Sequence, residues 1–208
     1  MAAHSSLPVV AAFDVDGTLT TRDCVVPFLR ELVGTVTLVG AVARRPAAAS
    51  GALVRRDRDA LKALAVGACR GRPASEVDRA GRAFADTRAR QWLRPDTTAR
   101  LRWHLAEGHR VVLVSASLRP YLEPLGEHLG VSDVLCTTFE TDGSGTLTGR
   151  LLGANCRGPE KAERLRVWLG GETAEIWAYG DSSGDRELLA LADRPHLVKG
   201  VTITEVPS

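Results

Sequence analysis

The 208-residue sequence predicts an α/β protein in which a parallel sheet is covered by helices and carries an inserted helical segment and a β-hairpin. Three observations support this prediction. Two apolar runs of strand length each end in an acidic loop, and segments typical of helices and strands alternate through the second half of the chain. A long stretch of helical character separates the first two expected strands.

Each of the two acidic loops follows an expected strand. Val9–Phe13 is a short apolar run typical of a buried strand, and Asp14 and Asp16 come directly after it. Ile176–Tyr179 is a second such run, and it leads into Gly180–Asp185. Ligands of open α/β sheets bind beyond the carboxyl ends of the strands. The acidic loops are therefore expected at positions where a ligand can bind.

From residue 96 onward the sequence alternates between helix and strand. Asp96 is the expected N-cap of a helix over Thr97–Glu107, Gly108 ends that helix, and Val111–Val114 follows as a strand. The other expected elements are a helix over Leu118–Leu129 with Ser117 as its N-cap and Gly130 at its end, a hairpin of Thr137–Glu140 with Thr146–Arg150, and a helix from Pro159 through Leu169.

Residues 25–92 are predicted to form a helical cap, and residues 1–24 and 93–208 the core of the fold. Between Val25 and Pro95 the chain carries 14 Arg and Lys against 6 Asp and Glu, which is +8 and leaves −6 for the rest of a chain with a net charge of +2. Such charge is most often a solvated helix face, although it also suits an anionic substrate, nucleic acid or a membrane surface.

The composition, with 44% hydrophobic and 25% charged residues, is that of an ordinary globular protein. The four cysteines lack zinc-ligand spacing, so buried thiols are expected. Met1–Pro8 does not resemble a secretory signal, and the most apolar segment, Leu32–Val42, is too short for a membrane helix. We therefore expect a cytoplasmic protein with no transmembrane segment. No nucleic-acid motif is present, so no such partner is expected, and the sequence does not indicate an oligomeric state.

Groups suited to phosphoryl transfer occur in order along the chain. Magnesium prefers oxygen ligands such as carboxylates, and phosphoryl transfer requires an in-line nucleophile, neutralisation of charge and protonation of the departing oxygen. Asp14 suits the nucleophile, and Asp16 suits the acid and base. The groups are Asp14 and Asp16 after the first strand, Ser115 after the second, Lys161 at a helix start, and Asp181 and Asp185 after a third strand.

These residues lie in segments that resemble the motifs of a known family. Asp14–Thr20 resembles the first motif of the haloacid-dehalogenase-like (HAD) phosphatases, and Ser115–Ser117, Arg157–Lys161 and Gly180–Asp185 resemble the second, third and fourth motifs in the same order. The helical insert resembles the cap of the phosphoserine-phosphatase-like branch, subfamily IB. The resemblance implies a Rossmann-like fold with a small helical lid, and magnesium-dependent hydrolysis of phosphate monoesters through an aspartyl-phosphate.

The resemblance also implies residue roles. Asp14 would be the nucleophile and a Mg²⁺ ligand, and Asp16 would be the general acid and base and a ligand through its backbone carbonyl. Thr18 is a further candidate, because it follows Gly17 where backbone amides and the hydroxyl can face an anion. The candidate residues are Asp14 and Asp16 for catalysis; Ser115, Ala116, Lys161, Thr18 and Asp23 for phosphate or substrate; and Asp14, Asp16, Asp181 and Asp185 for Mg²⁺.

The expected substrate is a small phosphorylated metabolite. Phosphoserine phosphatases carry Glu where this chain has Asp23, and a cap Arg where an ungapped count places Ala65, so phosphoserine is kept as an alternative. Asp23–Leu29 is similar to relatives that act on phospholipid head-group phosphates, which gives a second alternative. A phosphotransferase or mutase and a non-catalytic binding module complete the alternatives. The cap arginines that could grip an anionic substrate are Arg55, Arg56, Arg58, Arg70 and Arg72.

Overall fold

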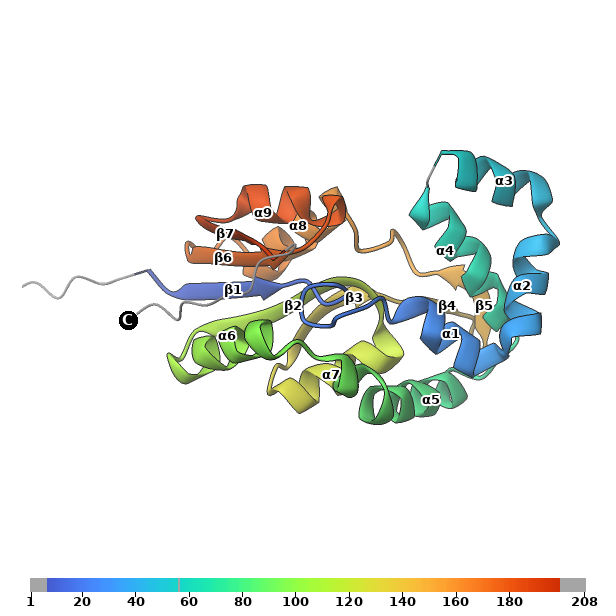
Figure 1. The fold of residues 1–208 in the computed structure, drawn as a ribbon, viewed down its shortest axis with the longest axis horizontal. Helices are drawn as coiled ribbons and strands as arrows, with labels where there is room; N and C mark the ends of the chain where they lie inside the picture. Colours follow the sequence, from blue (N-terminus) through green and yellow to red (C-terminus); the bar gives the residue numbers. More distant parts are fainter. Residues whose placement is uncertain (1–6, 56, 199–208) are drawn as a thin grey trace, which may run out of the picture.

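The computed structural model describes residues 7–55 and 57–198, and its centre is a five-stranded sheet (Figure 1). The strands of this sheet are β1 (Val9–Phe13), β2 (Arg110–Leu118), β3 (Asp133–Thr137), β6 (Glu175–Gly180) and β7 (Arg194–Leu197). They lie in the order β3-β2-β1-β6-β7, and every neighbouring pair is parallel. The carboxyl ends of β2, β1 and β6 are therefore neighbours at the middle of one edge.

Helices cover both faces of the sheet (Figure 1). One face carries α6 (Pro95–Ala106) and α7 (Arg119–Leu129), and the other carries α8 (Pro159–Leu169) and α9 (Arg186–Leu191). Because successive side chains of a strand point to opposite faces, a strand covered on both sides is apolar throughout. In β1, Ala11 and Phe13 belong to one hydrophobic cluster, while Val10 and Ala12 belong to the other.

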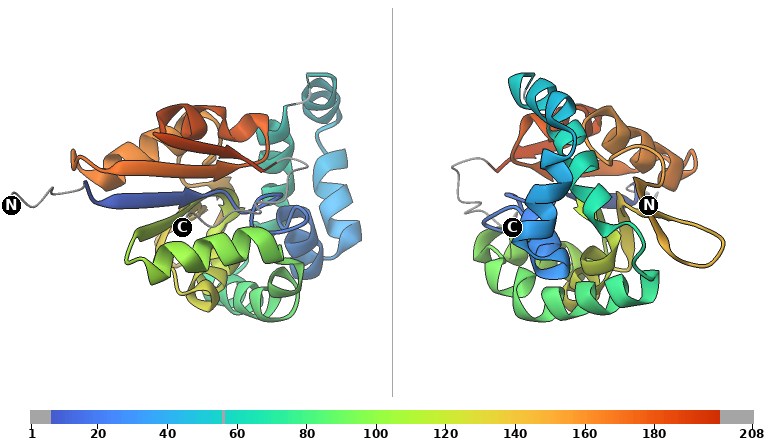
Figure 2. Two further views of the ribbon diagram at one scale, coloured as in Figure 1. Left: turned by 60° about the vertical axis from the view of Figure 1, so that its left-hand side comes forward. Right: turned by 90° about the vertical axis from the view of Figure 1, so that its right-hand side faces the viewer.

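A helical insert connects β1 to β2. Its helices are α1 (Val25–Val33), α2 (Thr35–Ala43), α3 (Pro46–Val54), α4 (Arg58–Val66) and α5 (Ala74–Thr87), with short 3₁₀ turns at Gly67–Cys69 and Ala89–Trp92. Helices α2, α3 and α4 stand beyond the carboxyl ends of the strands (Figures 1 and 2), whereas α5 packs along α7. A Cβ at Gly81 of α5 would overlap the carbonyl of Pro120, so this close contact requires glycine.

The hairpin consists of β4 (Phe139–Thr141) and β5 (Leu147–Leu151), which pair in antiparallel fashion. It is joined to the insert through its backbone. The Gly71 N–H donates to the Leu147 carbonyl at 2.9 Å, and the Leu147 N–H donates to the Arg72 carbonyl at 2.8 Å. The hairpin thus ties the segment before α5 to the second half of the chain.

The predicted fold class is confirmed: the chain forms an α/β fold with a parallel sheet, covering helices and a small antiparallel hairpin. The four cysteines are buried free thiols, as expected. Within the described residues no single helix is long and apolar enough to cross a bilayer; α1 and α2 reach that threshold only as a pair, which is bent by 106°.

The structure corrects both predicted N-caps. Helix α6 begins at Pro95 with Arg94 in the N-cap position, because proline is well suited to the first turn of a helix, and the Asp96 carboxylate instead accepts from Arg94 at 2.8 Å. Ser117 lies inside β2, which runs on to Leu118, the N-cap of α7. The Ser117 hydroxyl does not cap the helix and donates instead to Asp16.

Two strands of the sheet were not predicted, β3 and β7. Both lie at the edges of the sheet, where only one neighbour supports the strand and the sequence pattern is weaker. Pro195 in β7 is tolerated at an edge, but a proline argues against a strand in a sequence-based prediction. Thr137, which was expected to open the hairpin, is instead the last residue of β3.

Candidate active site

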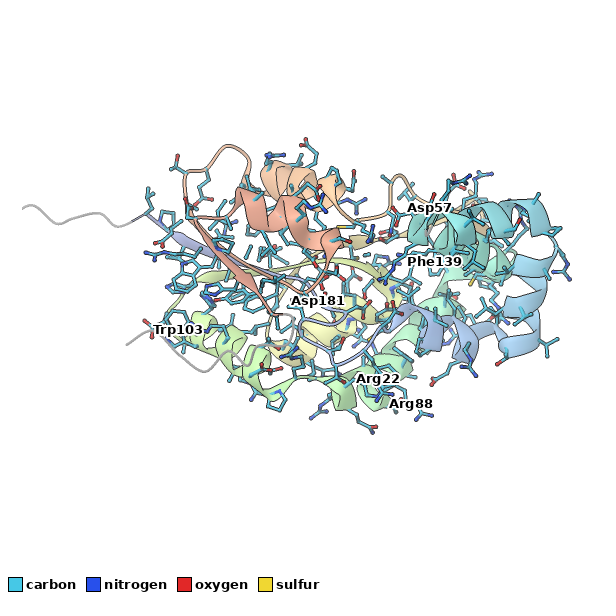
Figure 3. All side chains as sticks on the ribbon, turned by 45° about the horizontal axis from the view of Figure 1, so that its top comes forward. Arg22, Asp57, Arg88, Trp103, Phe139 and Asp181 are labelled. Atoms are coloured by element: carbon cyan, nitrogen blue, oxygen red, sulfur yellow. The ribbon has the colours of Figure 1, made fainter. Side chains whose placement is uncertain are left out.

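A cavity of about 530 Å³ lies between the carboxyl edge of the sheet and the insert helices α1 and α4. In Figure 3, Asp181 lies near the middle of the molecule, and Asp57, which precedes α4, lies on the side of the insert. The structure brings most of the predicted site residues to the wall of this cavity. Those on the wall are Asp14, Asp16, Asp23, Ser115, Ala116, Lys161, Asp181 and Asp185.

The loop after β1 is shaped by a tight turn. The carbonyl oxygen of Val15 accepts the backbone N–H groups of Thr18, Leu19 and Thr20, and Gly17 has a φ of 89°. A Cβ at Gly17 would overlap the Asp181 carboxylate, so glycine is required both for the conformation and for the close approach. The turn therefore allows the acidic loop after β1 to pack closely against the acidic loop after β6.

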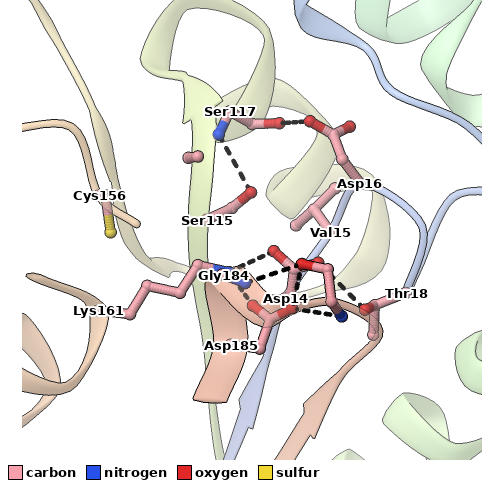
Figure 4. A network of polar contacts seen from close by, with 12 residues as sticks. Asp14, Val15, Asp16, Thr18, Ser115, Ser117, Cys156, Lys161, Gly184 and Asp185 are labelled. Atoms are coloured by element: carbon pink, nitrogen blue, oxygen red, sulfur yellow. Dashed lines mark hydrogen bonds and ion pairs between the residues drawn. The ribbon is translucent and has the colours of Figure 1, made fainter. Parts of the chain in front are cut away.

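Lys161 is the centre of a charged cluster on the cavity wall (Figure 4). Its ammonium group lies 2.5 Å from an oxygen of Asp14 and 2.5 Å from an oxygen of Asp185, and the residue is 2% exposed. Burial opposes the charged form of Lys161, but the two carboxylates outweigh it and raise the pKa of the ammonium group. A permanent cation therefore lies beside the Asp14 carboxylate.

Asp185 is held in place by the loop after β6. Its Oδ2 accepts the N–H of Asp181 at 3.2 Å, and both the N–H and the hydroxyl of Ser182 at 3.0 Å. Its other oxygen accepts from Lys161. Because one carboxylate takes up four donors, the loop and Lys161 are fixed relative to each other.

Three carboxylates form a candidate metal site. Asp14, Asp181 and Asp185 each offer an oxygen, and these oxygens lie within 4.8 Å of one another. Hard cations such as Mg²⁺ prefer carboxylate oxygen ligands, so the residues present fit this ion. The set comes from the ends of β1 and β6, which are neighbours in the sheet.

Asp16 is turned away from Lys161 and is held by two donors. Its Oδ2 accepts the hydroxyl of Ser117 at 2.7 Å (Figure 4). Its Oδ1 accepts the N–H of Cys24 at 3.0 Å. Burial raises the pKa of Asp16 to about 7, and the nearby charge of Asp23 adds to this effect. A carboxyl group with a pKa close to neutrality can both donate and accept a proton. Ser117, predicted to be a helix cap, is thus a contact of the candidate acid and base.

Ser115 and Thr18 differ in their access to the cavity. Ser115 is buried on the cavity wall, and its Oγ accepts the Ser117 N–H at 3.1 Å. Thr18 is not among the residues of the wall, and its hydroxyl donates to Asp14 Oδ2 at 3.0 Å. This placement supports a role for Thr18 in orienting Asp14 rather than in contacting phosphate.

The insert contributes a different set of side chains to the wall. Asp23 faces the cavity, and its Oδ1 also accepts the N–H groups of Val25 and Val26 at 2.9 and 3.2 Å. Of the arginines considered for substrate binding, Arg58 lines the cavity, Arg55, Arg70 and Arg72 are not part of its wall, and Arg56 lies outside the described residues.

The wall residues that the sequence analysis did not single out include Lys62 on α4 and Asn155 before α8. A single lysine in an amphipathic helix gives no signal that separates it from a solvated one. Asn155 lies three residues before the Gly158–Pro159 helix start, and only its position in space shows its importance.

Comparisons by sequence found a family model and a relative that each cover most of this chain. The family model described as haloacid dehalogenase-like hydrolase matches residues 11–190. Protein CicA of Caulobacter vibrioides is 37% identical over 187 residues, which cover 89% of this chain and 84% of that protein.

Solved structures show the same fold. A protein of unknown function from Bordetella pertussis Tohama I superimposes with a TM-score of 0.72 at 25% identity, covering 91% of this chain and 89% of that chain. A phosphoserine phosphatase with a phospho-aspartyl intermediate analogue has a TM-score of 0.60 at 19% identity, covering 90% and 84% of the two chains. With a family model that spans most of its length, the chain belongs to the haloacid dehalogenase-like hydrolases.

Proposed function

We propose that the protein is a magnesium-dependent phosphatase that hydrolyses a phosphate monoester through an aspartyl-phosphate on Asp14. The observation that carries the proposal is the buried cluster in which Lys161 lies between Asp14 and Asp185 at the cavity wall. Phosphoryl transfer is catalysed mainly by positioning and by neutralising charge on the phosphoryl oxygens. The cluster offers a carboxylate nucleophile and a fixed cation in the same place.

The residues suit both halves of such a reaction. In the first, an oxygen of Asp14 bonds to phosphorus as the ester oxygen departs, and Asp16 gives that oxygen its proton. In the second, Asp16 takes a proton from water, and the hydroxide displaces the Asp14 carboxylate from phosphorus. Lys161 and Ser115 are placed to bind phosphate oxygens. A Mg²⁺ ion held by Asp14, Asp181 and Asp185 would neutralise further negative charge on the phosphate.

The insert side of the cavity supports a small metabolite with an apolar part as the substrate. Five apolar residues of α1 and α4 line it: Val25, Val26, Leu29, Leu61 and Ala65. These residues favour burial of an apolar part of the substrate, while Asp23 and Arg58 on the same side of the wall can pair with a charged group. Phosphoserine and a phospholipid head-group phosphate are the two alternatives.

The test is a screen of the purified chain for phosphate release from many monoesters, including phosphoserine and a phospholipid that ends in a phosphate, with Mg²⁺ present. We expect release from at least one ester, and loss of that release in excess chelator. Calcium should inhibit, because it is larger and accepts more ligands than Mg²⁺. Isomerised product without free phosphate would indicate a mutase, and full activity in chelator would contradict the metal requirement.

A further inference from the structure

Lys62 is a cation on the cavity wall that lies outside the cluster of Lys161, Asp14 and Asp185. Its ammonium group crosses from α4 to the core, where it donates to the carbonyl oxygen of Ala116 and to Oδ1 of Asn155, the latter at 2.7 Å. Burial lowers the pKa of Lys62 to about 8. Withdrawing an ammonium group from water is unfavourable, and most lysines remain solvated. The two oxygens that hold Lys62 therefore indicate a defined role.

Asn155 joins α4 to the core through both ends of its amide. Its Oδ1 accepts the Thr137 hydroxyl at 2.7 Å as well as Lys62, and its Nδ2 donates to Asp59 at 2.7 Å. Asp59 and Lys62 are three residues apart, which places them on the same side of α4. We call Asp59, Lys62 and Asn155 the α4 clasp.

The clasp ends on a peptide that is part of the candidate active site. The Ala116 carbonyl and the Ser117 N–H belong to the same peptide unit, and this N–H donates to Ser115 Oγ at 3.1 Å. The Ser117 hydroxyl donates to Asp16 at 2.7 Å. A displacement of the Ala116 carbonyl would therefore move the groups that orient Ser115 and Asp16.

We propose that Lys62 is a positioning residue that holds the Ala116–Ser117 peptide so that the Ser117 hydroxyl aligns Asp16, which makes proton transfer by Asp16 depend on α4 being seated on the core. The proposal rests on the phosphatase function proposed above. Lys62 acts through the peptide and Ser117, and it takes no part in bond making itself. In this way the insert controls the chemistry of the core without contributing to it directly.

The experiment compares two esters that differ in their need for a proton. Phenolate is a poorer leaving group than 4-nitrophenolate, so phenyl phosphate depends more on the acid. Lys62→Met should lower kcat/KM at least about tenfold more for phenyl phosphate than for 4-nitrophenyl phosphate. Lys62→Arg should restore most of this difference. Arg79→Met, which removes an exposed cation from α5, is the matched control and should leave the ratio unchanged.

A second measurement follows the clasp itself. Amide hydrogen exchange in Arg58–Val66 should become faster in Lys62→Met and should not change in Arg79→Met. Asn155→Ala removes the acceptor that Lys62 shares with Thr137, and it should change the kcat/KM ratio in the same direction. This variant decides the question if Lys62→Met does not fold.

The outcomes separate the positioning role from simple support of the insert. A loss of equal size for both esters, or no loss, would overturn the proposal, because a lid that is merely loosened affects the two alike. If the unmodified protein releases phosphate from no monoester, the proposed function has failed. If it does so and the ratio is insensitive to Lys62 and Asn155, the positioning role alone has failed.

Discussion

The carboxyl edge of the sheet and the outer helices of the insert differ in how their side chains are held. At the edge, Lys161 contacts two carboxylates and Asp185 accepts four donors. In the insert, α2 buries Leu38 and α3 buries Ala52, while Val36 and Val54 are 87% and 83% exposed. The carboxyl edge of the sheet therefore holds polar side chains that are fixed by several hydrogen bonds and ion pairs. The outer insert helices α2 and α3 are apolar, and few of their side chains are buried.

This difference indicates a division of labour. Electrostatic catalysis requires charges that are fixed before the substrate arrives, and braced side chains supply them. The part of the substrate that does not react is bound by separate contacts. One such contact can be replaced without disturbing the catalytic groups. We therefore expect substitutions at the carboxyl edge of the sheet to abolish turnover for every substrate, and substitutions in the insert outside the α4 clasp to alter the choice of substrate.

The largest effect is expected at Asp14. Asp14→Asn should lower kcat by roughly a thousandfold or more, because the amide is a poor nucleophile. Combining it with Asp16→Asn should cost little more, since the two residues act in one reaction sequence. Phosphate release measures the effect, and circular dichroism checks that the fold is intact. Near-normal turnover by Asp14→Asn would contradict the expectation that the carboxyl edge of the sheet carries the chemistry.

A substitution of Lys161 tests whether the cluster of Lys161, Asp14 and Asp185 also stabilises the fold. Lys161→Met leaves Asp14 and Asp185 as neighbouring buried carboxylates without their cation, which should lower the free energy of unfolding by roughly 3–5 kcal/mol. Urea denaturation in chelator measures it, and Arg166→Met, an exposed residue of α8, is the control. Added Mg²⁺ should return part of the loss, whereas an unchanged midpoint would show that the cluster is not stabilising.

The site at the carboxyl ends of the central strands was largely predictable from the sequence, because these strands have clear local sequence patterns. Val9–Phe13 is apolar on both faces and is followed at once by Asp14, and Gly180 leads into Asp181 and Asp185. Such short-range patterns are set by the local backbone, as the turn at Gly17 shows. The outermost strand β7 lacks such an apolar pattern, and its Pro195 argues against a strand in a sequence-based prediction.

The core also contains a buried histidine whose titration should make stability depend on pH. His104 contacts His109 at 2.8 Å and Tyr179 at 2.9 Å. Burial lowers its pKa to about 3, and the positive charges of His109, Arg100 and His196 add to this shift. Its neutral form therefore contributes stability that is complete above pH 6.5 and is lost as the pH falls from 6.5 towards 3.

His104→Asn should remove that part of the pH dependence. Between pH 6 and pH 4 the slope of the unfolding free energy should be smaller than in the unmodified protein by up to ~1.4 kcal/mol per pH unit. Denaturant titrations across this range measure the slope. Arg102→Gln, at an exposed position of the same helix α6, should leave the slope unchanged. Identical slopes in His104→Asn and the unmodified protein would contradict the assignment.

The smallest effect is expected in the insert, and it should depend on the substrate. Arg58, at the start of α4, lines the cavity, and Arg55, three residues earlier at the end of α3, does not. Arg58→Ala should lower kcat/KM about tenfold for the preferred ester and change hydrolysis of 4-nitrophenyl phosphate little, because that ester lacks the recognised group. Arg55→Ala is the matched control. If both esters fall in parallel, the insert shields the site without selecting the substrate.

The residues that connect the two regions could not be predicted from sequence. Ser117 was expected to be a helix cap, because a serine before a helix is typical of that role, and its contact with Asp16 depends on β2 continuing to Leu118. Lys62 lies 54 residues from Ala116 in the chain, so nothing local marks the pair. Contacts of this kind are set by tertiary packing.

The central claim is that phosphate is transferred to Asp14, and trapping the intermediate tests it most directly. In Asp16→Asn the second step lacks its base, so the phosphorylated protein should accumulate when 4-nitrophenyl phosphate and Mg²⁺ are added. Acid quenching, intact-mass measurement and peptide mapping should place one phosphate on the peptide that contains Asp14. An unmodified chain that continues to release nitrophenol, or a phosphate on a different residue, would contradict the account.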